Sequence, residues 1–102
     1  MDSLKKDFLE YQAKTTPHPL ALSIKKAKGS YITTTDNKKY LDFVAGVSAC
    51  SLGHRHPKVV AAIRRQTRNY LHVMVYGEFA QAPAVQLCKE LVELLPENQE
   101  RV

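Results

Sequence analysis

The stretch KGSYITTTDNKKYLDFVAG, residues 28–46, decides the fold of this 102-residue chain. Residues 31–35 are β-branched or aromatic, and residues 40–44 are again largely aromatic and aliphatic. Residues 36–39 between them begin with Asp-Asn, whose side chains bond to nearby backbone and tolerate left-handed dihedral angles. The stretch therefore predicts a β-hairpin with its turn at residues 36–39.

The residues before the hairpin predict a short helix and a connector. Residues 3–14 carry one apolar helical stripe, with Asp2 or Ser3 available as the N-cap. The stripe consists of Leu4, Phe8, Leu9 and Tyr11. The two prolines of TTPHPLALSI, residues 15–24, favour extended backbone, so we expect an arm that crosses a surface.

The residues after the hairpin predict an irregular loop and two helices. The small residues that follow Gly46 suit a loop that passes close to another backbone or to a ligand. Pro57 and Pro83 each fit the first position of a helix, and Pro96 ends the second one. The expected apolar stripes are Val59, Val60, Ile63, Tyr70 and Leu71 on the first helix, and Leu87, Cys88, Leu91, Val92 and Leu95 on the second. The expected fold class is α+β.

Composition describes one compact domain or a piece of a larger one, with 44% hydrophobic residues and a formal net charge of +5. Cys50 and Cys88 fit no metal or disulfide spacing and lie in apolar surroundings, as buried reduced thiols do. No run approaches the ~20 apolar residues of a membrane span, and the N-terminus lacks a signal-peptide core. We expect a cytoplasmic protein without membrane contact.

The sequence GHRHP, residues 53–57, could hold a metal or start a helix. A metal site would need further ligands, and no cysteine or carboxylate stands nearby at a recognised ligand spacing. The favoured interpretation is structural: Gly53 provides an unusual turn, His54 packs or bonds locally, and His56 sits at the cap before the helix that Pro57 begins. We predict no metal ligands.

A basic helix face offers an alternative function, a small module that binds nucleic acid or a protein partner. Its residues are Lys58, Arg64, Arg65 and Arg68. A basic helix face is usually just solvated, and no aromatic residues are interleaved with these arginines for base stacking. Nucleic-acid binding is therefore the less favoured interpretation.

The order of the motifs from Gly29 to Gln66 carries a family resemblance. GSYITTTDNKKYLDFVAGVSACSLGHRHPKVVAAIRRQ resembles the N-terminal region of class III pyridoxal-phosphate-dependent aminotransferases of the ornithine and acetylornithine type, subgroup II. That region has a Tyr-Leu-Asp-Phe strand, an Ala-Gly loop, Gly-His-x-His-Pro and an Ala-Ile-x-x-Gln helix. The resemblance spans residues 17 to about 96, and it departs at Asn37, where the family often has glycine.

The resemblance implies a fold-type I transferase in which this chain forms part of the small domain. It implies pyridoxal 5'-phosphate as cofactor, an amino donor and a 2-oxo acid as substrates, and a homodimer. The family's phosphate-binding loop, its aspartate for the pyridine nitrogen and its Schiff-base lysine are expected beyond Val102. We therefore assign no catalytic or cofactor-binding residue here and expect these 102 residues alone to be inactive.

The resemblance also implies the site residues. Val47 matches the family position that lies against the substrate, and Gly46 and Ser48 are its neighbours. Tyr76 is expected to pack at the dimer interface or the substrate entrance. The implied divisions are 1–28 for helix and arm, 29–56 for hairpin and substrate-side loop, and 57–102 for a helical segment that leads towards the large domain.

Overall fold

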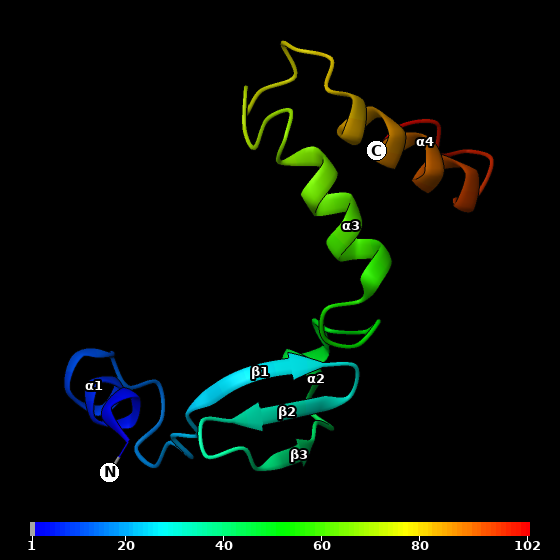
Figure 1. Ribbon diagram of the computed structural model, residues 1–102. Coiled ribbons are helices and arrows are strands. Elements are labelled where there is room, and N and C mark those ends of the chain that lie inside the picture. The colour runs from blue at the N-terminus through cyan, green and yellow to red at the C-terminus, as the bar shows by residue number, and fades with distance from the viewer. Residues whose placement is uncertain (1) are drawn as a thin grey trace. The chain divides into compact units, whose positions relative to one another are not determined.

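A computed structural model describes residues 2–102 (Figure 1). The elements in chain order are α1 (Ser3–Tyr11), β1 (Ile24–Lys28), β2 (Tyr31–Thr34), β3 (Lys39–Leu41), α2 (Ala45–Ser48), α3 (Pro57–Gln66) and α4 (Ala82–Leu94). The chain divides into two compact units, one up to Arg65 and one from Gln66 to Val102. Helices with a small antiparallel sheet confirm the expected α+β class.

The sheet has three antiparallel strands in the order β1-β2-β3. The predicted hairpin is confirmed as β2 and β3, with Ile32 opposite Tyr40. The third strand was not expected, because β1 lies in residues that the prolines marked as a connector. Its sequence IKKAK has no alternation of apolar side chains, and it becomes a strand by pairing with β2 through an irregular register between Ile24 and Lys26.

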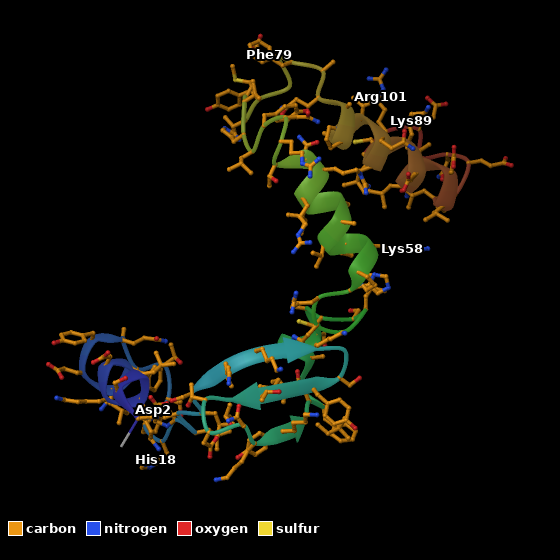
Figure 2. All side chains as sticks on the ribbon, in the orientation of Figure 1. Asp2, His18, Lys58, Phe79, Lys89 and Arg101 are labelled. Atoms are coloured by element: carbon orange, nitrogen blue, oxygen red, sulfur yellow. The ribbon has the colours of Figure 1, made fainter. Side chains whose placement is uncertain are left out.

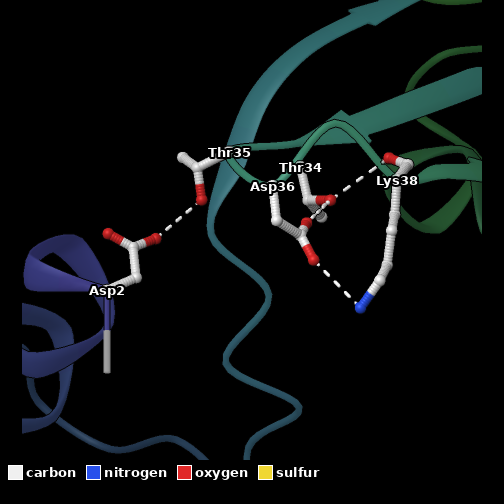
Figure 3. A network of polar contacts seen from close by, with 5 residues as sticks. All are labelled: Asp2, Thr34, Thr35, Asp36 and Lys38. Carbon is white, nitrogen blue, oxygen red and sulfur yellow. Dashed lines mark hydrogen bonds and ion pairs between the residues drawn. The ribbon is translucent and has the colours of Figure 1, made fainter.

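A polar network fixes the turn between β2 and β3 and joins it to the start of α1 (Figure 3). Thr34 donates to the Asp36 carboxylate, which also pairs with the Lys38 ammonium at 3.0 Å. These two contacts, the Thr34 hydroxyl first, lower the pKa of Asp36 to about 2. Thr35 Oγ1 donates to Asp2 at 2.7 Å, and Asp2 also accepts from the amide of Leu4 as the N-cap of α1.

Both long C-terminal helices begin near the expected prolines, but the first is shorter than predicted. α3 ends at Gln66, so Tyr70 and Leu71 lie outside it and do not extend its apolar stripe. The amides of Asn69 and Tyr70 turn back to the carbonyl of Gln66, whose side chain donates to the carbonyl of Tyr70 at 3.1 Å. The polar residues after Gln66 favour such local bonds over a continued helix. α1 likewise ends at Tyr11, before the expected limit of residue 14.

Apolar side chains in both units are exposed to solvent. No hydrophobic side chain in residues 2–102 is buried, and the residues that are buried in this range, Thr33 and Thr34, are polar. The exposed apolar residues include Leu4 on α1, Ile63 on α3 and Leu87 on α4. No helix in the described residues is long and apolar enough to cross a membrane.

Candidate functional site

The Gly-His-x-His-Pro turn is held against the end of β1 by backbone bonds. The amide of Gly29 donates to the carbonyl of His54 at 2.9 Å, and the amide of His54 donates to the carbonyl of Gly29 at 2.8 Å. A Cβ at Gly53 would lie only 3.2 Å from the carbonyl oxygen of Gly29, and Gly53 has φ of 82°. The unusual turn and the close backbone approach expected there are both confirmed.

Asp42 ties the loop after β3 to the same turn. One carboxylate oxygen lies 2.6 Å from Nε2 of His54, and the other accepts from the amides of Val44 and Ala45 at 2.9 and 3.0 Å. The side chains are largely buried, 6% exposed for Asp42 and 18% for His54. The His54 contact first, and then the backbone amides, lower the pKa of Asp42. Of the two roles expected for His54, packing or bonding, the structure shows a bond, and its partner lies 12 residues away in sequence.

The predicted substrate-side residues lie on a left-handed turn. α2 consists of Ala45, Gly46, Val47 and Ser48, with φ angles of 50°, 61°, 58° and 65°. Left-handed backbone is unfavourable for all but glycine, and most of all for a β-branched residue such as Val47. The Val47 side chain is 84% exposed. The sequence predicted an irregular loop here, and its regular left-handed path was missed.

A pocket of about 220 Å³ lies under this turn, lined by residues of the loop and of the Gly29 bridge. Its lining includes Asp42, Ala45, Cys50 and His54, and Val47 is not part of it. The structure thus brings Asp42 and His54 together beneath the turn and leaves Val47 facing outward. Whether Gly46, Val47 and Ser48 contact a substrate stays a prediction.

His56 lies in the same turn as His54 but makes no metal-binding cluster with it among residues 2–102. His56 accepts the amide of Val60 through its carbonyl, as a residue before the helix should, and its Nδ1 is buried without a hydrogen-bond partner. His18 lies near α1, at the other end of the first unit (Figure 2). Among residues 2–102, no three histidine, cysteine or acidic side chains are arranged to hold a metal ion.

The basic helix face is only partly formed. Lys58, Arg64 and Arg65 lie exposed on α3, but Arg68 follows the end of the helix. The expected stripe of four basic residues on one helix is therefore wrong in its last member.

The second unit contains an apolar groove of about 580 Å³ along α4. Phe79, Lys89 and Arg101, which Figure 2 labels, contribute to its lining, as does Cys88. Cys50 and Cys88 are free thiols, as expected, but both are only half-buried. Tyr76 is 73% exposed, so it packs against little within this chain.

Asp42 is the residue that sequence reasoning missed. It belongs to the Tyr-Leu-Asp-Phe motif, but no role was assigned to it. Its signal was an aspartate three residues before the small residues that begin at Ala45, the pattern of a side chain that caps its own backbone.

The family model for aminotransferase class-III matches residues 11–102. Acetylornithine aminotransferase of Methanocaldococcus jannaschii is 40% identical over 75 residues, which are 74% of this chain and 18% of that protein. The chain therefore spans about a fifth of this relative's length.

Solved structures agree with the family match. Ornithine aminotransferase from Plasmodium yoelii superposes with a TM-score of 0.78 at 26% identity, covering 94% of this chain and 24% of that one. Adenosylmethionine-8-amino-7-oxononanoate aminotransferase from Methanocaldococcus jannaschii gives a TM-score of 0.81 at 25% identity, covering 97% and 24%. The fold of this chain is that of the N-terminal part of these structures.

Proposed function

We propose, because this chain belongs to the class-III aminotransferase family, that it is the N-terminal portion of an enzyme that transfers an amino group from an amine or amino acid to a 2-oxo acid. The observation that carries the proposal is the family match over residues 11–102, together with the Gly-His-x-His-Pro turn built against Gly29. Relatives named for acetylornithine and ornithine make amino acids with a second amino group the first donors to test.

The family depends on pyridoxal phosphate, which withdraws electrons from the carbon that bears the amino group. Asp42, the carboxylate under the left-handed turn, does not fit the pyridine nitrogen of that cofactor. The largely buried Asp42 already accepts from His54 and from two backbone amides, so it is not available to a pyridine nitrogen. We place the cofactor-binding residues in the part of the family's length that this chain does not span.

The role of this chain in transfer is to shape the substrate side of the site. Asp42 and His54 hold the two ends of the loop, and Val47 stands exposed at its left-handed turn. An aliphatic side chain there favours apolar contact with the substrate over hydrogen bonding. Val47, with Gly46 and Ser48, would thus select among substrates and take no part in proton transfer.

The enzyme is also proposed to be a cytoplasmic homodimer. The exposed apolar faces of α1, α3 and α4 require covering surfaces, and a second subunit would supply part of them. Two free cysteines agree with a reducing compartment.

The test is a transamination assay of the full protein, expressed from its own reading frame and supplied with pyridoxal phosphate. Ornithine, acetylornithine and simple diamines serve as donors to a 2-oxo acid. Absence of transfer with every donor would contradict the proposed function.

A Val47→Tyr variant tests the substrate role separately. We expect the ratio of kcat/KM between two donors to change by about tenfold, since one altered pocket contact is worth roughly 1–3 kcal/mol. The matched control is Leu94→Tyr, at an aliphatic residue that is similarly exposed but lies on α4 in the second unit. An unchanged ratio in Val47→Tyr would remove Val47 from the substrate site and leave the transfer activity standing.

A further inference from the structure

One face of the sheet carries a row of cations. The register places Lys26 opposite Thr33 and Thr33 opposite Lys39, so these three side chains share a face across all three strands. The next row on the same face pairs Lys28 with Tyr31. Three lysines therefore surround a threonine and a tyrosine.

The Gly-His-x-His-Pro loop adds a wall to this face of the sheet, and the two together form a pocket. The two backbone bonds between Gly29 and His54 bring Leu52, Arg55 and His56 beside the lysines. Arg55 itself has a left-handed φ of 55°, a conformation that disfavours a long side chain unless the surroundings impose it. The resulting pocket has a volume of about 570 Å³, within the range of small-molecule sites.

The charges in this pocket are unbalanced. Its lining contains three lysines, one arginine and two histidines, and no carboxylate of residues 2–102 lines it, although His54 is paired with Asp42 behind the lining. Neighbouring cations are partnered: Lys25 donates to Asn37 at 2.9 Å, and Lys38 pairs with Asp36. By contrast, the side chains of the lining lysines and of Arg55 make no ion pair or hydrogen bond with the described residues.

Concentrated like charge destabilises a fold through self-repulsion, and a bound anion relieves it. His56, which also lines the pocket, has a buried Nδ1 that finds no hydrogen-bond partner among the described residues. We propose that this face, which we call the lysine pocket and define by Lys26, Lys28, Lys39 and Arg55, binds a small anion with two or more negative charges. Phosphates and polycarboxylates share that chemistry. The lysine pocket includes none of the expected substrate residues, so the inference stands apart from the proposed transfer activity.

The test is calorimetric titration of the full protein with pyrophosphate and, separately, with citrate. The pocket variant carries Lys26→Gln, Lys28→Gln and Lys39→Gln. The control carries Lys5→Gln, Lys6→Gln and Lys14→Gln, which removes the same net charge outside the pocket. A third variant with arginine at the three pocket positions keeps the charge.

We expect at least one of the anions to bind, and the pocket variant to bind it about tenfold more weakly, because each exposed ion pair contributes modestly. The control and the arginine variant should bind as the unaltered protein does. Binding of pyrophosphate alone identifies a phosphate ligand, and binding of citrate as well extends the class to carboxylates. Failure to bind either anion, or equal weakening in the pocket variant and the control, would overturn the proposal.

Discussion

The carboxylate of Asp42 lies 2.6 Å from Nε2 of His54, across 12 residues of chain, and its second oxygen receives the amides of Val44 and Ala45. One largely buried side chain thus fixes both ends of the loop that carries Val47. A charge-assisted bond of this kind is stronger than a neutral one.

Asp42→Asn should loosen that loop. The amide oxygen can still accept from the backbone, but it is uncharged and a weaker acceptor, and the charged contact with His54 is lost. We expect faster hydrogen exchange at the amides of Val44 and Ala45, because both depend on the Asp42 carboxylate. Asp7→Asn on α1 is the control, since Asp7 is exposed and far from the loop in sequence. Equal exchange in the two variants would show that Asp42 does not hold the loop.

The Asp36 turn gives a pH-dependent contribution to stability. Its pKa is lowered from 3.8 to about 2, so the contribution is fully present above pH 3.8 and is lost as the pH falls towards 2. Titration of the Asp36 carboxyl followed by NMR should show the low midpoint. Thr34→Val removes the main cause and should raise the midpoint towards 3.8, whereas Thr33→Val, at the neighbouring buried threonine, should leave it low.

Gly53→Ala should weaken the turn against β1. The new methyl group would lie 3.2 Å from the carbonyl oxygen of Gly29, and φ of 82° is unfavourable for alanine. The cost should be about 1–2 kcal/mol in the free energy of unfolding, measured by denaturant titration of the full protein. Gly77→Ala is the matched control, because nothing lies within 4 Å of its added Cβ. A loss no larger than in the control would contradict the close approach.

Local signals explain which parts of the fold were predictable. The hairpin, the Asp2 cap and the two proline-started helices each depend on residues a few positions apart, so pattern alone places them. The strand β1 was not predictable from IKKAK, because its neighbour β2 provides the hydrogen bonds that define it. The end of α3 was misplaced because Tyr70 and Leu71 continue the helical period beyond the point where polar residues stop the helix.

The site was predictable only in part for a similar reason. The turn at Gly53 and the helix start after His56 can be predicted from the glycine itself and from Pro57. The pairing of Asp42 with His54 cannot, because it depends on the path of the loop between them. The left-handed turn was hidden because three of its four residues are not glycine.

Val47→Gly should relieve the backbone of the turn. Left-handed dihedral angles cost a non-glycine residue about 1–2 kcal/mol, which glycine avoids. The greater chain entropy of glycine in the unfolded state offsets up to about 1 kcal/mol of this gain in stability. We therefore expect a gain of up to about 1 kcal/mol in the free energy of unfolding. Val44→Gly is the control, because Val44 has a right-handed φ of -85° and should lose about 1 kcal/mol. A destabilisation of equal size in both variants would show that Val47 does not adopt the left-handed conformation.

The isolated 102 residues should self-associate or remain partly open. No hydrophobic side chain of residues 2–102 is buried, and Leu4, Ile63 and Leu87 are respectively 48%, 57% and 57% exposed on three different helices. A sheet of three short strands cannot cover that much apolar surface, so another surface must do so. Sedimentation should show a concentration-dependent mass, and hydrogen exchange should show weak protection of α1 and α4. A monodisperse monomer with uniformly protected helices would mean that the segment is self-sufficient, and would favour the alternative of a small binding module.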